Sequence, residues 1–335
     1  MTNKNLSWNN QPLLLKPVGK DYLWGGNRLN DDFSKQIPLS PLAETWECST
    51  HSDGLSTVRG GEFDGITLKE VLRQHPEYAG SSLLPNGELP ILIKLIDAKE
   101  DLSVQVHPDD EYAATHENGS LGKYEMWYVL DAAADSQLVY GFNRDIDSET
   151  LKESLQQGTI EKFLQYIPIQ KDDVFFIQPG QVHAIGAGAL IAEVQENSNL
   201  TYRLYDYNRL DKNGLPRPLH TKKALDVITL QNTSEPRQPM RVLRYQKGFA
   251  SELLCRCKYF QTERLLINTD SPLAPACCKP SQRSFQVLLC VEGFGVLLPD
   301  GGQTIAFCKG DCIFIPANAA TFMLQGKAQI LKVGC

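Results

Sequence analysis

The chain has 335 residues, a formal net charge of −7, 42% hydrophobic residues and 22% charged residues. This composition is ordinary for a globular protein and argues against intrinsic disorder. The acidic balance argues against a nucleic-acid partner, which would require a basic surface. We expect more than one lobe, because single hydrophobic cores stop growing at roughly 250–300 residues.

The N-terminal residues contain no apolar core long enough for a signal peptide, and no run of about 18 apolar residues that could span a bilayer occurs in the chain. The nine cysteines lie mostly in apolar, strand-like text and form no C-x-x-C pair. We interpret them as reduced thiols and expect a cytoplasmic protein with no membrane partner. The oligomeric state is not predicted.

Residues 11–60 consist of short apolar pieces broken by Gly, Pro and Asn, which is typical of strands and turns. Thr67 and Glu70 have the spacing of a capping box and predict a helix over about 67–76. Lys94 interrupts a strand-like apolar run over residues 89–96. Its side chain either reaches out to solvent or points into a polar cavity, and the residues alone favour neither.

Residues 103–110 (SVQVHPDD) carry the strongest chemical signal. Gln105 and His107 are two residues apart, so in a strand both side chains point to the same face. A following strand contains Glu125, and a turn at residues 178–180 precedes a second imidazole at His183. Imidazole nitrogen and carboxylate oxygen suit zinc or a similar transition metal, so we predict a divalent-metal site.

Helical patterns interrupt the strands at 148–166, with Ser148 as the expected N-cap, and at 221–228. Residues 233–239 are polar and Pro-rich, which predicts a linker. We therefore expect a catalytic, metal-binding lobe over residues 1–235 and a second lobe over 241–335. Many short strands with few helices predict a mainly β protein built from jelly rolls.

A weak internal repeat relates residues 173–183 to residues 311–321. Each segment is an acid, an apolar strand and a tight turn, but the first ends in His183 and the second in Thr321. The last histidine of the chain is His220, so we expect the second lobe to be degenerate and metal-free.

Four motifs in order resemble the type I mannose-6-phosphate isomerases, zinc enzymes of the cupin superfamily. They are residues 103–109 (SVQVHPD), 122–128 (GKYEMWY), 180–184 (GQVHA) and 197–206 (NSNLTYRLYD). The resemblance runs from about residue 17 to the C-terminus and is to the compact bacterial form. It implies two cupin jelly-roll barrels and an isomerase that interconverts mannose 6-phosphate and fructose 6-phosphate.

The resemblance also implies roles for individual residues. Positions that match the family's ligands to one zinc ion per chain are Gln105, His107, Glu125 and His183. Arg203 matches the family's active-site arginine. Positions that match the sugar-phosphate pocket are Lys94, Ser103, Lys123 and Glu193. The family commonly has an acid where this chain has Asn199, so we assign Asn199 only a hydrogen-bonding role with substrate.

An aldose–ketose isomerisation moves a proton between C1 and C2 through an enediol, and so requires a base and positive charge near O1 and O2. Arg203 and the metal would supply the charge. Glu193, Lys94 and Lys123 are candidates for the base, and the sequence does not choose among them. The phosphate would be bound by some of Lys94, Lys123 and Arg203 with the Ser103 hydroxyl.

Three alternatives stay open at this point. Two His and one carboxylate also form the facial triad of non-haem iron oxygenases, although an oxygenase of a neutral substrate would not need the cations. A sugar-binding module that senses without converting is a second alternative, since fold alone does not fix function. An isomerase of another sugar phosphate is the third.

Overall fold

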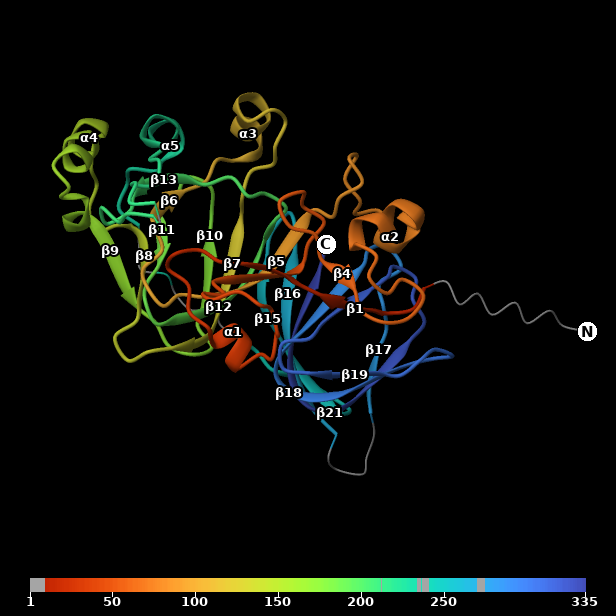
Figure 1. Ribbon diagram of the computed structural model, residues 1–335. Helices are drawn as coiled ribbons and strands as arrows, with labels where there is room; N and C mark the ends of the chain where they lie inside the picture. The colour runs from red at the N-terminus through yellow and green to blue at the C-terminus, as the bar shows by residue number, and fades with distance from the viewer. Residues whose placement is uncertain (1–9, 212, 234–235, 237–240, 270–274) are drawn as a thin grey trace, which may run out of the picture.

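The structure is a computed structural model that describes residues 10–211, 213–233, 236, 241–269 and 275–335. The predicted mainly β architecture is confirmed: in this part of the chain five short α-helices accompany three antiparallel sheets (Figure 1). Most of the predicted linker at 233–239 lies outside the described residues. None of the described helices is long and apolar enough to cross a membrane.

Two sheets face each other in the first lobe, and their inward side chains, among them Ile96, Trp127 and Ile185, form one apolar cluster. The first sheet has the strand order β10 (Val174–Ile177), β7 (Glu125–Ala132), β12 (Ala189–Glu196), β5 (Ile91–Asp97), β3 (Glu44–Cys48), β2 (Val18–Lys20). The second has the order β13 (Tyr202–Tyr205), β6 (Val104–Val106), β11 (His183–Ile185), β8 (Gln137–Phe142), β9 (Leu164–Pro168).

The second lobe is a ten-stranded sheet. Its main path is β14 (Arg244–Gln246), β15 (Phe249–Arg256), β16 (Gln261–Asn268), β21 (Phe322–Gly334), β18 (Gln286–Pro299), β20 (Cys312–Ile315), β1 (Leu13–Lys16), β4 (Thr57–Val58), with β17 (Ala276–Cys278) on β21 and β19 (Ile305–Cys308) on β18. The N-terminal strand β1 pairs with β20 through Leu13 and Phe314, so the two ends of the chain are joined in one sheet.

The helices follow the capping signals. In α2 (Leu68–Gln74) the Thr67 side chain accepts a hydrogen bond from the Glu70 N–H, as the capping box predicts. α5 (Thr221–Val227) lies at the predicted place. The other described helices are α1 (Arg28–Asp31), α3 (Asp110–His116) and α4 (Ser148–Gln156). α3, α4 and α5 lie at the upper edge of Figure 1, and α4 and α5 pack on the five-stranded sheet.

The prediction of one helix over 148–166 is wrong in its C-terminal half. α4 (Ser148–Gln156) ends ten residues earlier, and a 3₁₀ turn (Ile160–Lys162) leads into strand β9. The N-cap of α4 is Asp147 and not Ser148, because the Asp147 carboxylate accepts a hydrogen bond from the Thr150 N–H. Gly158, with a φ of 65°, stops the helix because it adopts the left-handed conformation that favours glycine.

The internal repeat has a structural counterpart. β10 and β20 are each followed by a residue with positive φ at the same offset, Gly180 at 81° and Asn318 at 58°. Before each strand an acid closes the same turn: Asp173 accepts from the Gln170 N–H and Asp311 accepts from the Cys308 N–H. The two turns therefore have the same local construction, although their sequences share few residues.

The strand orders also correspond. β10-β7-β12-β5-β3-β2 in the first lobe has the same sequence of pairings as β20-β18-β21-β16-β15-β14 in the second. Glu125 lies opposite Ile177 in the first lobe, and Gln286 lies opposite Ile315 in the second. Side chains alternate between the faces of each strand. Thus Met126 and Val287 enter the apolar cluster shared by both lobes, while Trp127 and Leu288 point into their own lobes.

A polar contact closes the junction between the lobes beside that shared cluster. The Tyr259 hydroxyl of the second lobe donates to the Asp110 carboxylate of the first. Nearby, the buried Glu196 accepts from the Tyr124 N–H at 2.9 Å. Burial and the neighbouring Asp110 charge raise the pKa of Glu196 to about 8.

This pKa predicts how stability depends on pH. Between the ordinary value of 4.5 and about 8 the folded protein retains a proton on Glu196 that the unfolded chain releases, so rising pH costs stability in this window. We expect Glu196→Gln to remove that loss, making the variant more stable than wild type at pH 8.5 and close to it at pH 5. Thermal unfolding followed across this range tests the prediction, and parallel curves for the two proteins would contradict it.

Candidate metal centre and active site

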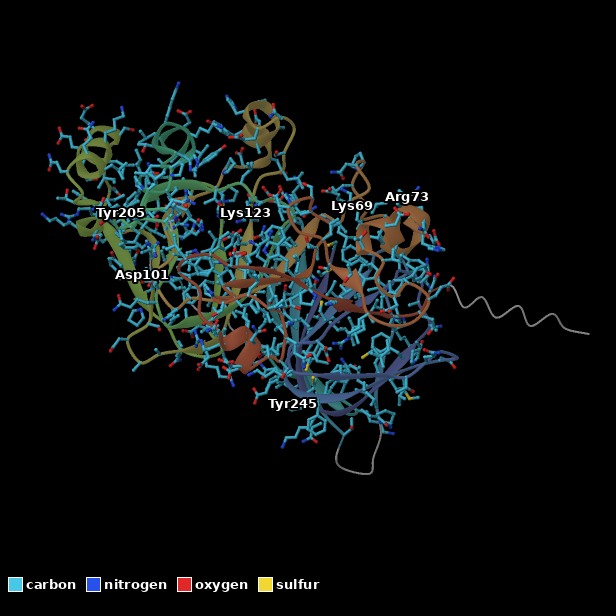
Figure 2. All side chains as sticks on the ribbon, in the orientation of Figure 1. Lys69, Arg73, Asp101, Lys123, Tyr205 and Tyr245 are labelled. Atoms are coloured by element: carbon cyan, nitrogen blue, oxygen red, sulfur yellow. The ribbon has the colours of Figure 1, made fainter. Side chains whose placement is uncertain are left out.

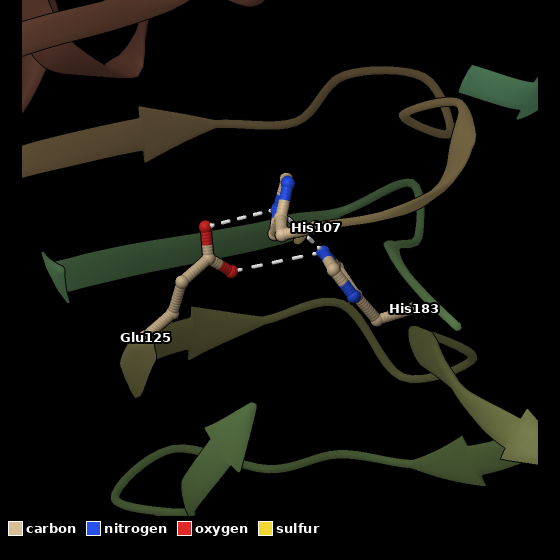
Figure 3. A group of neighbouring side chains, drawn as sticks. All are labelled: His107, Glu125 and His183. Carbon is tan, nitrogen blue, oxygen red and sulfur yellow. Dashed lines mark hydrogen bonds and ion pairs between the residues drawn. The ribbon is translucent and has the colours of Figure 1, made fainter. Parts of the chain in front are cut away.

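Three buried side chains converge where β6, β7 and β11 begin or end. Ligand atoms of His107, Glu125 and His183 all lie within 4.8 Å of one another. The two Nε2 atoms are 3.0 Å apart, Glu125 Oε1 is 3.3 Å from His107 Nε2, and Glu125 Oε2 is 3.7 Å from His183 Nε2. Figure 3 shows one carboxylate oxygen turned toward each imidazole. The structure thus brings these three sequence-predicted residues together.

His183 presents a lone pair to the centre. His183 Nδ1 lies 2.8 Å from the Gln181 carbonyl oxygen, which accepts its proton and leaves Nε2 free to bind a metal. Burial lowers the pKa of His183, and burial together with the Lys123 charge lowers the pKa of His107 to about 3. Both rings are therefore neutral, as metal ligation requires.

Hydrogen bonding within the protein does not satisfy this cluster. Both Glu125 oxygens and His107 Nδ1 are buried, and no hydrogen bond from the described residues reaches them, although the Lys123 ammonium lies 2.8 Å from Glu125 Oε1. A buried carboxylate facing two neutral imidazoles is costly unless a cation lies between them. The donor set fits a divalent metal.

Gln105 is the fourth predicted ligand. It pairs with His183 across β6 and β11, and its amide nitrogen lies 3.3 Å from His183 Nε2. The oxygen and nitrogen of an amide exchange places when the group rotates by half a turn. Such a rotation therefore brings the Gln105 amide oxygen to the position of its nitrogen, beside His183 Nε2. The structure therefore brings all four predicted ligand residues together, with His107 one residue beyond the end of β6.

The turn before His183 holds the cluster in place. The Gly180 N–H donates to the His107 carbonyl oxygen at 2.9 Å, which ties the turn to the end of β6. Gly180 has a φ of 81°, and a Cβ there would lie 2.8 Å from the Val227 carbonyl oxygen. Only glycine fits this close approach without strain.

A cavity of about 300 Å³ opens beside the metal cluster. Gln105 and Lys123 line it and connect it to the three buried ligands. Lys123 is 3% exposed and lies within the body of the molecule in Figure 2, whereas Arg73 lies at its edge. The other predicted pocket residues that line the cavity are Lys94, Ser103, Glu193, Asn199 and Arg203.

A buried ion pair forms one wall. Lys94 and Glu193 lie opposite each other on β5 and β12, with Nζ and Oε2 3.1 Å apart. The Lys94 side chain therefore points into the cavity and not to solvent. Burial opposes its charge, but Glu193 and two other carboxylates outweigh burial and raise the pKa of Lys94. Burial and the Glu125 charge raise the pKa of Glu193.

The opposite wall carries Arg203. Its Nε donates to Ser103 Oγ at 3.3 Å and its Nη1 donates to the Pro218 carbonyl oxygen at 2.8 Å, so the guanidinium is held in place. Asn199 lies at the cavity mouth and donates to the Asp53 carboxylate at 2.7 Å. An aspartate at position 199 would instead face another carboxylate.

Other lining residues were not identified from the sequence. Trp127 Nε1 donates to Glu193 Oε1 at 3.2 Å, and the Trp127 ring meets His183 edge-on. Tyr22, Glu44 and Arg217 also line the cavity. Trp127 lies in the motif that contains Glu125, two residues further along the strand, so alternation could have placed it on the same face. Tyr22 and Glu44 carry no such local signal.

Comparison with known proteins agrees with this geometry. A family model described as the catalytic domain of type I phosphomannose isomerase matches residues 13–126, and one described as the cupin domain of mannose-6-phosphate isomerase matches residues 254–334. The chain is 36% identical to mannose-6-phosphate isomerase ManA of Bacillus subtilis over 321 residues, covering 96% of this chain and 98% of that protein. It is 32% identical to the mannose-6-phosphate isomerase of Streptococcus mutans, covering 96% of this chain and 97% of that protein.

Solved structures show the same relationship. The crystal structure of the mannose 6-phosphate isomerase from Bacillus subtilis matches with a TM-score of 0.87 at 34% identity, covering 96% of this chain and 99% of that one. A phosphomannose isomerase from Salmonella typhimurium, at 17% identity, shares the fold with a TM-score of 0.73 over 96% of this chain and 98% of that one. The chain belongs to the type I phosphomannose isomerase family.

Proposed function

We propose that this protein interconverts mannose 6-phosphate and fructose 6-phosphate as a metal-dependent aldose–ketose isomerase. The observation that carries the proposal is the buried cluster of His107, Glu125 and His183 beside a cavity with several cations in its wall. Full-length relatives named mannose-6-phosphate isomerase support the same reaction. All nine cysteines are free thiols, in keeping with a cytoplasmic location.

We propose zinc as the metal, one ion per chain, held by Gln105, His107, Glu125 and His183. Two imidazole nitrogens, a carboxylate and an amide oxygen are ligands that zinc accepts. When bound, the ion supplies a Lewis acid that polarises sugar oxygens. Lys123, 2.8 Å from Glu125, brings a further positive charge to the border between the metal centre and the cavity.

Glu193 is our candidate for the base that moves the proton between C1 and C2. Lys94 and Trp127 each hold one of its carboxylate oxygens, which fixes its orientation in the cavity wall. A carboxylate can take the proton from one carbon and return it to the other, because both carbons lie within reach of one oriented group. Lys123 would stabilise the negative charge that develops on the enediol oxygens.

Arg203 and Ser103 are the best placed groups for the phosphate. Lys94 and Lys123 are already paired with Glu193 and Glu125, whereas the side-chain hydrogen bonds that Arg203 makes within the described part of the chain go to a hydroxyl and a carbonyl oxygen. A guanidinium of this kind retains donors for a phosphate. Asn199 at the mouth would add a hydrogen bond to the sugar. An oxygenase with a neutral substrate would have no use for these cations.

We further propose that both lobes are cupin barrels, the catalytic one over residues 1–235 and a degenerate, metal-free one over 241–335. The matching strand orders support the two barrels. At the positions of the first lobe's ligands Glu125 and His183, the second lobe has Gln286 and Thr321. Neither residue type provides the carboxylate or imidazole of the first centre. Strands β1 and β4 then lie within residues 1–235 of the sequence but form part of the ten-stranded sheet of the second barrel.

Removal of one ligand tests the metal site. We expect His183→Ala and Glu125→Gln to stay folded, to lose the bound metal and to lose turnover roughly a thousandfold, because a metal ion supplies several kcal/mol of transition-state stabilisation. His116→Ala is the matched control, since His116 is exposed on α3. Metal analysis and conversion of mannose 6-phosphate measure the two effects. A His183→Ala protein with full turnover would refute the site, and bound iron without isomerase activity would favour an oxygenase.

The assignment of the base has a separate test. We expect Glu193→Gln to retain the metal and substrate affinity but to lose turnover by roughly a hundredfold or more, the usual effect of removing a general base. Glutamine keeps the hydrogen-bonding shape but cannot take the proton. The variant's kcat and KM, measured beside its metal content, decide the role. Unchanged turnover in Glu193→Gln would refute this assignment and leave Lys94 and Lys123 as the candidates for the base.

A further inference from the structure

The second lobe contains a cavity of its own. It has a volume of about 470 Å³ and lies among β14 to β18 and β21. Gln286 and Leu288 of β18, Glu263 and Leu265 of β16, and Lys332 of β21 line it. Side chains alternate between the two faces of these strands. The face that lines the cavity is the inward face, which also carries Leu288, Cys290 and Ile330 of the second lobe's apolar cluster. The cavity is therefore the mouth of the second lobe's interior.

This cavity occupies the place that the substrate cavity occupies in the first lobe. The Gly180 N–H donates to the His107 carbonyl oxygen, and at the corresponding turn the Asn318 N–H donates to the Ser281 carbonyl oxygen. Ser281 thus corresponds to His107, and Lys279, two residues earlier, corresponds to Gln105. Together with Gln286 and Thr321, these residues replace the whole ligand set of the first lobe.

The ion pair in the wall is also repeated, with its signs exchanged. In the first lobe Lys94 on β5 lies opposite Glu193 on β12, and Glu193 lies opposite Trp127 on β7. In the second lobe Glu263 on β16 lies opposite Lys332 on β21, and these two side chains form an ion pair. Lys332 lies opposite Leu288 on β18, as Glu193 lies opposite Trp127.

Exchanging the signs leaves the ion pair neutral, so the charge of each cavity depends on the other lining residues. In the described lining of both cavities cations outnumber carboxylates: Lys94, Lys123, Arg203 and Arg217 against Glu44 and Glu193 in the first, and Arg244, Lys279 and Lys332 against Glu263 in the second. Arg244 and Lys279 are exposed and Lys332 is half-buried, so the surplus of positive charge in the second lobe lies at the mouth of its cavity. Lys279, at the position that corresponds to Gln105, brings a positive charge to the place where the first lobe would hold its metal ion.

We propose that the second lobe's interior is a metal-independent binding site for a small organic phosphate. Lys332 and Lys279 would bind the phosphate by charge-assisted hydrogen bonds, and Arg244 stands at the rim. The apolar floor formed by Leu265, Leu288 and Phe322 would contact the carbon skeleton. This site is separate from the metal centre, and the proposal does not depend on the isomerase activity.

Calorimetric titration with glucose 6-phosphate tests the proposal on the full chain in the presence of a chelator. We expect Lys332→Gln to weaken binding at this site roughly tenfold or more, the effect of removing one charge-assisted hydrogen bond. Glu263→Gln should strengthen it, because the carboxylate no longer competes for Lys332. Lys327→Gln is the matched control, since this exposed lysine of β21 does not line the cavity.

The outcomes separate this site from the first cavity. Under the proposal, binding persists in Arg203→Gln, whose substitution affects only the first lobe, and neutral glucose does not bind in its place. Unchanged mannose 6-phosphate turnover in Lys332→Gln shows that the variant is folded, and Lys279→Gln provides a second test if it is not. Equal affinities in Lys332→Gln and Lys327→Gln, or a single site that is lost with Arg203, would overturn the proposal.

Discussion

The centre of the first lobe depends on one electrostatic constraint, the burial of the Glu125 carboxylate against two neutral imidazoles. Among the described residues no hydrogen bond reaches either of its oxygens, and the cation that lies beside them is the Lys123 ammonium. Such an arrangement is stable when a divalent ion lies among the three side chains, and it is costly otherwise. Strands of both facing sheets begin or end around these three side chains, and the Gly180 turn holds the end of β6 in place.

The two lobes show how one scaffold supports different chemistry. Pairing order and the alternation of side chains are the same in both, so each lobe has an apolar floor and a polar mouth. The residues at the mouth differ in kind: His107 and Glu125 stand in the first lobe where Ser281 and Gln286 stand in the second. Reversal of the buried Lys94–Glu193 pair into the half-buried Glu263–Lys332 pair keeps an ion pair while it changes which strand carries the positive charge.

Local patterns in the sequence were sufficient for much of the fold and for the residues that meet at the proposed metal centre. The spacing of Gln105 and His107, and the capping box at Thr67, follow from backbone periodicity and hydrogen bonding that act over a few residues. The end of α4 was mispredicted because a 3₁₀ turn and strand β9 continue its apolar pattern. The pairing of β1 with β20 joins residues about 300 positions apart, and no local pattern encodes it. Glu44 reaches the cavity for the same reason, because β3 pairs with β5 and places Glu44 opposite Ile96.

The most direct test of the account follows mannose 6-phosphate conversion by the purified protein of known metal content, before and after treatment with a chelator. We predict that fructose 6-phosphate formation stops when the metal is removed and returns when zinc is added, in proportion to the zinc bound. Full turnover by protein shown to contain no metal would contradict the central claim that the His107, Glu125 and His183 cluster acts by holding an ion.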